Sequence, residues 1–197
     1  MNLKPAAENS VCFEPFFTIR PMRQDDLAQV RAIDQASFNL PWPESAYNYE
    51  LNQNPLSLLW VAVHNAATGT DQDPLLILGM VVVWIILDEA HIATIAVHPE
   101  YRHKGIAQCL MVEALKGAIG RGVREATLEV RTSNIAAQKL YQRFRFETVG
   151  ERRHYYRDNN ENALIMTVSG LDSNYLAWLE SGDWKQKRYS ELQGDAQ

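Results

Sequence analysis

An α/β fold with a mixed sheet is predicted by two patterns in the sequence. Two apolar segments, residues 56–63 and 75–87, flank a loop rich in turn residues, as in an antiparallel pair of strands. In residues 92–141 the hydrophobic period then changes from strand to helix and back, which indicates a strand–helix–strand crossover with two parallel strands. The chain has 197 residues, 46% of them hydrophobic, which is enough for one domain with a buried core.

The elements before these strands follow from hydrophobic spacing and from turn residues. Residues 1–15 show no periodicity and are expected to form a loosely ordered lead-in. A short strand, FFTIR, comes next, and the helical spacing of apolar residues predicts a helix over 24–38. Two prolines in NLPWP end that helix and place a tryptophan on a loop, after which a second helix is predicted over 44–52.

Each element of the crossover has its own signal. The segment AHIATIAV, residues 90–97, is almost continuously apolar, as expected for a strand covered on both faces. From Gly105 to Ile119 the apolar residues form one helical stripe, which predicts an amphipathic helix. The second parallel strand is ATLEVR, and Ser133 or Asn134 is expected to cap the helix that follows.

The C-terminal part is predicted to add two strands and an extension. The strands are expected over 146–153 and 162–168, joined by a loop that contains Tyr155 and Tyr156. Residues 169–197 are expected to form a C-terminal extension, a short helix followed by a polar tail.

The composition argues against several classes of protein. A formal net charge of −5 gives no global attraction for nucleic acid, although it suits a partner with a basic peptide segment. Cys12 and Cys109 lie far apart and outside any CxxC or Cys/His cluster, so neither a metal site nor a disulfide framework is expected. The N-terminus lacks a signal-peptide pattern, and the longest apolar run is too short to span a bilayer as a helix. A cytoplasmic protein without membrane contact is therefore expected.

The turn from Arg102 to Ala107 is a candidate anion site. A helix start leaves backbone N–H groups unpaired and carries partial positive charge, and Gly105 allows a ligand to approach closely. Arg102 and Lys104 add full charges. On spacing alone an ordinary strand-to-helix turn explains the pattern equally well, and neither GxxxxGK[ST] nor GxGxxG is present.

Glu129 and Tyr141 are candidates for proton transfer. Alternation along ATLEVR puts Glu129 on one face with Thr127 and Arg131, where a solvated face or a Glu–Arg pair would be a sufficient explanation. In a crossover unit both sheet faces tend to be covered, which favours a carboxylate that lines a cleft. Tyr141 alone fits a core aromatic residue whose hydroxyl is hydrogen-bonded. Its interest comes from its place soon after Glu129.

Three segments carry a resemblance to a known family: IAVHPEYRHKGIA, LEVRTSNIAAQKLY and RRHYYRDNNENALIM. They closely resemble the GNAT acetyltransferase superfamily, and within it the RimI-type ribosomal-protein-alanine N-acetyltransferases. The likeness covers residues 16–168, which would be the acetyltransferase domain. It implies the GNAT fold, an α+β sandwich with a mixed, mostly antiparallel sheet whose central parallel strands splay around acetyl-CoA.

The resemblance also implies roles for individual residues. Glu129 would be the general base and Tyr141 the general acid of a direct acetyl transfer that needs no metal. Pro41 and Trp42 on the first loop, with Tyr155 and Tyr156 on the last, are expected to wall a groove for an extended peptide end, although these aromatic residues could simply pack the loops. Acetyl-CoA would be held by Ile95, Ala96, Val97, Arg102, His103, Lys104, Gly105, Ile106, Ala107, Gln108 and Asn134.

The chemistry of amines favours a protein N-terminus as acceptor. At pH 7 about a tenth of a terminal amine with a pKa of about 8 is neutral, whereas a lysine amine is almost entirely charged. One carboxylate base is adequate for the terminal amine. The resemblance implies the N-terminal alanine of a small-subunit ribosomal protein. Two alternatives stay open, namely a GNAT enzyme acting on other N-termini, lysines or a small amine, and a catalytically silent acyl-CoA-binding module.

Arg145 departs from the pattern of the family. The family usually has a glycine before the phenylalanine that follows the last motif helix, whereas this chain has Arg145 in RFRF. A glycine there suggests a positive φ, which arginine adopts at a cost. A local adjustment of the helix end, with the fold retained, is expected.

Overall fold

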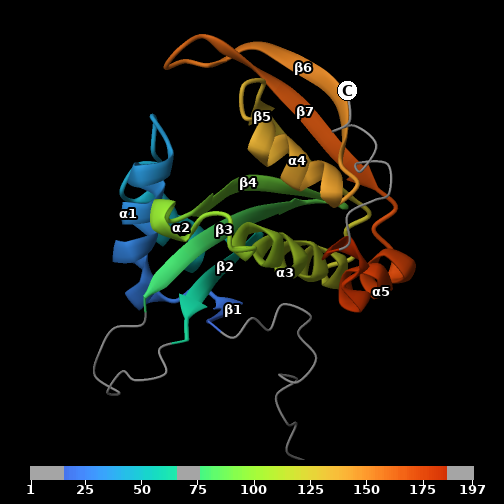
Figure 1. The fold of residues 1–197 in the computed structure, drawn as a ribbon, viewed down its shortest axis with the longest axis horizontal. Helices are drawn as coiled ribbons and strands as arrows, with labels where there is room; N and C mark the ends of the chain where they lie inside the picture. The colour runs from blue at the N-terminus through green and yellow to red at the C-terminus, as the bar shows by residue number, and fades with distance from the viewer. Residues whose placement is uncertain (1–15, 66–75, 186–197) are drawn as a thin grey trace, which may run out of the picture.

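A single seven-stranded sheet organises the chain. The computed structural model describes residues 16–65 and 76–185, and its strands lie in the order β1-β2-β3-β4-β5-β7-β6. All neighbouring strands are antiparallel except β4 and β5, which are parallel. The predicted α/β fold with a mixed, mostly antiparallel sheet is confirmed (Figure 1). The strands are β1 Phe17–Pro21, β2 Ser57–His64, β3 Ile77–Ile86, β4 Glu89–Val97, β5 Glu125–Arg131, β6 Glu147–Tyr156 and β7 Glu161–Ser169.

Within the described residues, five α-helices and three 3-10 helices accompany the sheet. Apolar residues of α1 and α2 pack on one face of β2 and β3, and α3 packs on the opposite face. Figure 1 shows α3 running in front of β2 and β3, with α4 beside β5. The helices are α1 Leu27–Ser37, α2 Ala46–Asn52, α3 Ile106–Gly120, α4 Ile135–Arg143 and α5 Ser173–Ser181, with η1 Gln24–Asp26, η2 Pro99–Tyr101 and η3 Asp183–Lys185.

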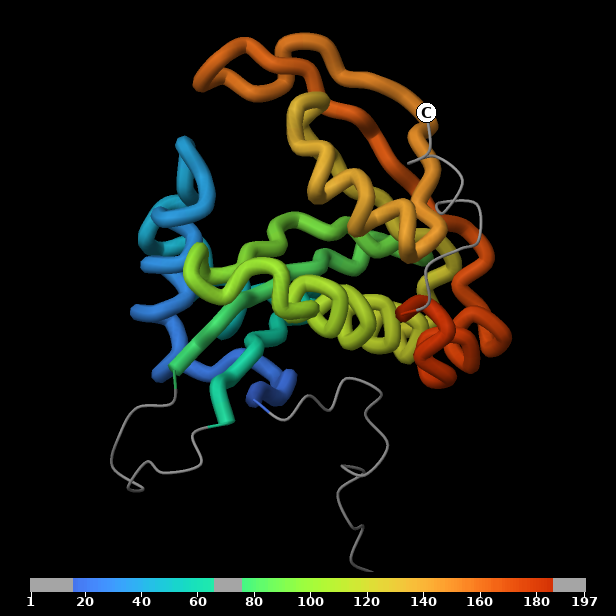
Figure 2. Tube along the Cα trace, viewed as in Figure 1, coloured from blue at the N-terminus to red at the C-terminus, as the bar shows by residue number. Residues whose placement is uncertain are grey.

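The two parallel strands separate soon after they meet. β4 and β5 pair at only three positions, the last of which joins His91 to Thr127. Beyond that point the strands diverge, and the sheet opens into a half made of β1 to β4 and a half made of β5, β7 and β6 (Figure 2). The splayed pair that the resemblance implied is therefore present.

Two local predictions need correction. β4 is not covered on both faces: its residues alternate between buried and half-exposed, and half-exposed members such as His91 and Ile95 border a cavity. An apolar run alone could not reveal this, because a cavity wall can be as apolar as a packed face. Tyr155 and Tyr156 lie in β6 rather than in the loop, because β6 continues until Tyr156 pairs with Glu161.

The segment after β7 packs into the main core. The expected short helix is α5, and Leu171, Tyr175, Leu179 and Trp184 are buried in the same hydrophobic cluster as α3. Figure 1 shows α5 beside the C-terminal end of α3. The expected lead-in at 1–15 and the polar tail at 186–197 lie outside the described residues.

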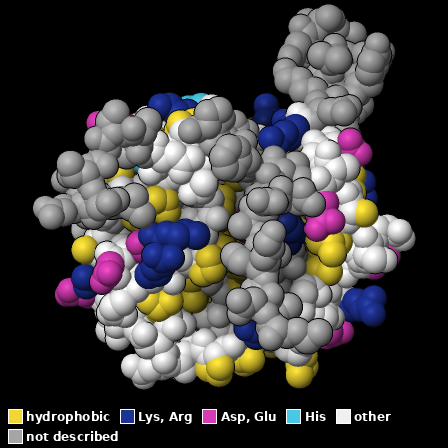
Figure 3. Space-filling view, turned by 90° about the horizontal axis from the view of Figure 1, so that it is seen from below, with side chains coloured by type: hydrophobic (Ala, Val, Ile, Leu, Met, Phe, Trp, Pro, Cys, Tyr) yellow, Lys and Arg dark blue, Asp and Glu magenta, His cyan; other side chains and the backbone are white. Residues whose placement is uncertain are grey.

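The described residues contain no helix suited to cross a bilayer, and basic side chains are scattered on the face drawn in Figure 3. Within 16–65 and 76–185, every helix is too short or too polar to span a membrane. Figure 3 shows the underside of the molecule, where Lys and Arg side chains lie in several separate groups among hydrophobic and acidic ones.

Gly79 in β3 is predicted to be needed for close packing. A Cβ atom there would lie 2.8 Å from the carbonyl oxygen of Ala96 and 3.2 Å from side-chain atoms of both Ile106 and Leu110. Because backbone cannot yield as a side chain can, Gly79→Ala should lower the free energy of unfolding by about 1–3 kcal/mol, measured by urea titration. Gly150→Ala is the matched control, since its Cβ would meet only the end of the Ile165 side chain at 3.5 Å. Equal midpoints for the two variants would contradict this packing argument.

Candidate active site

A cavity of about 710 Å³ lies where β4 and β5 diverge. One wall is β4 with the turn that leads into α3, and the other is β5 with α4 and the end of β6. The loop between α1 and α2 borders it as well, through Phe38 to Leu40 and Trp42. Three segments that are distant in the sequence therefore meet around one space.

The turn before α3 has an unusual backbone. His103 has a φ of 63° and Gly105, the N-cap of α3, has a φ of 81°, so the chain reverses sharply and α3 starts at the cavity. The first-turn N–H groups of a helix have no partner within it, and they carry its positive dipole end. The Arg102 side chain ties this turn to two neighbouring segments. Its Nε donates to the carbonyl of Val97 at 3.2 Å, and its Nη2 donates to Ser37 Oγ at 3.3 Å.

Most residues expected to hold the cofactor surround this cavity. Lys104 is the exception: its ammonium lies over the rings of Tyr101, at 5.1 Å, and Phe16, at 5.8 Å, and it does not line the space. Asn134 lines it and also caps α4, accepting from the backbone N–H of Ala137 at 3.1 Å. The cofactor-binding candidates at the cavity are Ile95, Ala96, Val97, Arg102, His103, Gly105, Ile106, Ala107, Gln108 and Asn134.

Glu129 faces the cavity from β5. The strand alternates as predicted, with Ala126, Leu128 and Val130 buried, so Glu129 is on the opposite side. Its side chain is 9% exposed, and Oε1 lies 3.0 Å from Arg152 Nη2. The two readings left open by the sequence are therefore both present, since Glu129 lines a cleft and also forms an ion pair with an arginine.

His91 is a neighbour of Glu129 that the sequence analysis did not single out. Its Nε2 lies 3.3 Å from Glu129 Oε2, and its ring stacks on Trp84 at 5.7 Å. Both His91 and Trp84 line the cavity. The available signal was a lone histidine in the apolar strand AHIATIAV. Its significance depends on the register of β4 against β5, which local patterns do not contain.

Tyr141 lies in the same cavity wall, on α4. Only 6% of the residue is exposed, and its ring is 6.0 Å from that of Phe146. Burial, with a smaller effect of nearby Tyr156, raises the pKa of Tyr141 well above its usual value. The phenol is therefore protonated at neutral pH and can donate that proton.

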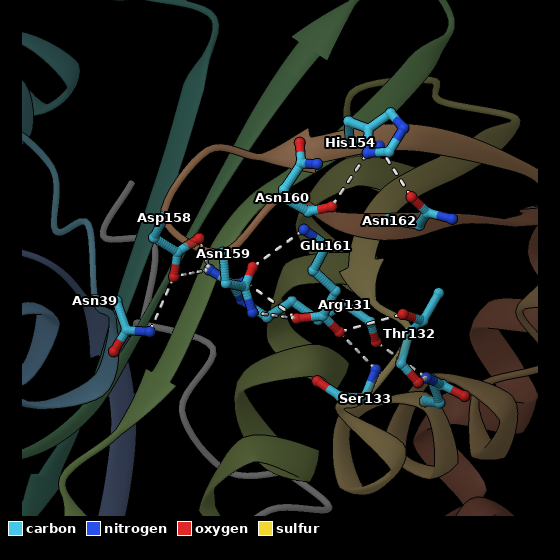
Figure 4. A network of polar contacts seen from close by, with 11 residues as sticks. Asn39, Arg131, Thr132, Ser133, His154, Asp158, Asn159, Asn160, Glu161 and Asn162 are labelled. Carbon is cyan, nitrogen blue, oxygen red and sulfur yellow. Dashed lines mark hydrogen bonds and ion pairs between the residues drawn. The ribbon is translucent and has the colours of Figure 1, made fainter.

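A polar network joins the far end of β5 to the β6–β7 turn (Figure 4). Arg131 Nη2 lies 2.8 Å from Asp158 Oδ1, its Nη1 lies 3.2 Å from Glu161 Oε2, and its guanidinium lies 3.8 Å from the centre of the Tyr156 ring. Glu161 also accepts from the backbone N–H of Ser133 at 2.8 Å. Hydrogen bonds, first of all from Ser133, lower the pKa of Glu161 to about 2. The network thus fixes the strand end next to Glu129.

The same network reaches the opposite loop. Asn39 Nδ2 donates to Asp158 Oδ2 at 2.9 Å, which links the α1–α2 loop to the β6–β7 turn. Figure 4 shows Asn39 pointing toward Asp158 from the other side. Because Asn39 and Tyr156 both line the cavity, this contact joins two of its walls.

Of the expected substrate-binding residues, Trp42, Tyr155 and Tyr156 line the cavity and Pro41 does not. Trp42 is also held from behind: its backbone N–H donates to Asp34 at 2.7 Å, and its ring stacks on Tyr47 at 5.0 Å and on Trp84 at 5.9 Å. These aromatic side chains therefore both pack the loops and face the space. Among the described residues, no group of three or more His, Cys, Asp and Glu side chains is arranged to hold a metal ion.

Known proteins share this sequence and architecture. The sequence model of the Acetyltransferase (GNAT) family matches residues 27–146. A Bacillus subtilis (strain 168) protein, provisionally named a ribosomal protein bS18-alanine N-acetyltransferase, is 36% identical over 151 residues, which make up 77% of this chain and 94% of that protein. The crystal structure of the ribosomal-protein-S18-alanine N-acetyltransferase from Escherichia coli has a TM-score of 0.67 at 30% identity, covering 78% of this chain and 93% of the other.

A further solved structure extends the likeness to a protein crystallised with a peptide and CoA. A chain of the NatC complex bound to Gag peptide and CoA has a TM-score of 0.66 at 25% identity, covering 78% of this chain and 98% of that one. The resemblance noted in the sequence is thus confirmed by a family match over more than half of the chain and by relatives that align along most of their length. The chain belongs to the Acetyltransferase (GNAT) family and is an acetyltransferase.

Proposed function

We propose that this enzyme transfers the acetyl group of acetyl-CoA to a protein N-terminal amine, and that its acceptor is the N-terminal alanine of ribosomal protein bS18. The observation that carries this proposal is that Glu129 and Tyr141 both line one cavity between the diverging strands. The names of the Bacillus subtilis and Escherichia coli relatives support this acceptor.

The turn before α3 suits the pyrophosphate of coenzyme A. The turn with positive φ at His103 and Gly105, together with the N-terminal turn of α3, offers backbone N–H groups to an anion, and Gly105 adds no side chain in their way. We infer that Ile95, Ala96 and Val97 bind the pantetheine arm through the backbone edge of β4 that no longer pairs with β5. When bound, acetyl-CoA supplies the thioester that is attacked. N–H groups at the same edge would stabilise the oxyanion.

Glu129 is proposed as the general base. The acceptor amine loses a proton to Glu129 as its nitrogen attacks the thioester carbonyl, directly or through one water molecule. His91, with Nε2 3.3 Å from Glu129 Oε2, is placed to receive that proton from Glu129 and pass it to solvent. The ion pair with Arg152, at 3.0 Å, orients Glu129.

Tyr141 is proposed as the general acid. As the C–S bond breaks, the thiolate leaving group takes the phenolic proton of Tyr141. A coenzyme A thiol has a pKa of about 8.5, so this help is worth roughly 10²- to 10⁴-fold in rate rather than being essential. The place of Tyr141 in the cavity wall carries this role. Burial raises the pKa of Tyr141 and so makes the phenol a weaker acid, which means that its proton must move as the C–S bond breaks.

Glu129→Gln is expected to lower kcat by about 10²-fold or more, because the amide cannot accept the amine proton. The KM for acetyl-CoA should change little, since Glu129 is not placed at the pyrophosphate turn. Initial rates of thiol release at pH 6 to 9 measure both constants. Glu113→Gln is the control, because Glu113 pairs with Lys116 on α3 and does not line the cavity. Activity of Glu129→Gln at the wild-type level over that whole range would refute the assignment.

The acceptor is tested with a set of peptides. We expect thiol release from acetyl-CoA with a peptide that begins with alanine and continues with the bS18 sequence. A peptide that carries an internal lysine behind a blocked terminus should react at least tenfold more slowly, since a lysine amine is mostly charged at neutral pH. Peptides that begin with Ser or Met should also react more slowly, because the proposed acceptor site is selective for an N-terminal alanine. Equal rates for all peptides would favour an enzyme of broader scope. Binding of acetyl-CoA by calorimetry without any thiol release would favour a silent binding module.

A further inference from the structure

A strained residue follows the helix that carries Tyr141. Arg145 has a φ of 63°, in the left-handed region that glycine adopts freely and a residue with a Cβ atom adopts at a cost. The arginine itself takes up this conformation, so the local adjustment expected from the sequence is not what occurs. Something in the structure must therefore hold Arg145 in place.

The segment 171–185 contacts Arg145 and the two residues before it. The Arg145 guanidinium carbon lies 4.1 Å from the centre of the Trp178 ring, a cation–π contact, and 5.7 Å from that of Tyr175. Tyr175 Oη donates to the carbonyl of Phe144 at 2.6 Å. Arg143 Nη1 donates to the carbonyl of Trp184 at 3.2 Å. Residues 143–145 are thus each held by a different part of the C-terminal segment.

The C-terminal segment is itself rigidly packed. Tyr175 and Trp184 are 4% and 2% exposed, and Phe144, which is fully buried, lies 5.5 Å from the Trp184 ring and 6.4 Å from that of Trp178. These buried aromatic contacts fix the C-terminal segment, so it can hold the residues that it touches in place. The tight turn at 144–146 is therefore held against the hydrophobic core.

The turn is built on the backbone of Tyr141. The carbonyl oxygen of Tyr141 accepts from the N–H groups of Phe144, at 2.9 Å, and of Phe146, at 3.1 Å. The Phe146 ring also contacts that of Tyr141. A change in the φ of Arg145 would alter the direction of Phe146 and, through these bonds, the last turn of α4. The position of Tyr141 in the cavity wall depends on that turn.

We propose that residues 171–185 act as a built-in clamp that positions Tyr141 for catalysis, with Trp178 on Arg145 as its main contact. Trp178 is a positioning residue, since it does not line the cavity. The proposal rests on the acid role proposed for Tyr141. It assigns a task to the C-terminal segment beyond its share in the core.

The test compares variants at both ends of the cation–π contact. Trp178→Leu keeps apolar packing but removes the aromatic face, and we expect kcat to fall about tenfold with the KM of both substrates within twofold, because small misplacements of a reacting group cost up to about 10²-fold. Trp178→Phe should recover most of that loss. Arg145→Ala should be several-fold slower than Arg145→Gly, because only glycine adopts the positive φ without support. Thermal unfolding of each variant shows that it is folded.

The double variant Arg145→Gly with Trp178→Leu decides the matter. If the clamp serves to hold Arg145, this enzyme should be as fast as Arg145→Gly alone and faster than Trp178→Leu. A double variant as slow as Trp178→Leu would overturn the proposal, as would a wild-type kcat in Trp178→Leu. Tyr141→Phe separates the two proposals: a wild-type kcat there refutes the acid role itself, whereas a slow Tyr141→Phe beside a wild-type Trp178→Leu refutes only the clamp.

Discussion

The early separation of β4 from β5 is the constraint on which the rest of the structure depends. Parallel strands normally satisfy each other's backbone groups, and here the pairing stops after three residue pairs. The remaining length of β4 therefore presents an unpaired edge to a cavity instead of to a strand. Such an edge needs a partner, and an extended molecule with its own hydrogen-bonding groups, such as the pantetheine arm of coenzyme A, can supply one.

The chemistry of the site follows from what the opening brings together. β5 carries Glu129 to one wall, β4 brings His91 to within 3.3 Å of it, and α4 adds Tyr141 from the same side as β5. Arg152 compensates the charge of Glu129 from two strands away. A nearly buried carboxylate is costly without such a partner, so the cavity-lining position of Glu129 and its ion pair with Arg152 occur together.

Contacts at the edges of the sheet hold its two halves together. The Asn39–Asp158 contact joins the α1–α2 loop to the β6–β7 turn across the cavity, and Arg131 anchors that turn to the end of β5. On the other side, the C-terminal segment packs against α3 and against the residues after α4. These contacts hold the two halves of the sheet at a fixed spacing, although β4 and β5 share only three residue pairs.

The sequence by itself determined the elements, the crossover and the strand face of Glu129, because hydrophobic period, caps and alternation are local properties. The family motifs added the turn at Gly105 and the pair of Glu129 and Tyr141. Only the tertiary structure decided that His91 meets Glu129, that β4 borders a cavity, and that Trp178 stacks on Arg145. Each of these contacts joins residues that are distant along the chain. Strand register and packing bring them together, and neither can be inferred from a local sequence pattern.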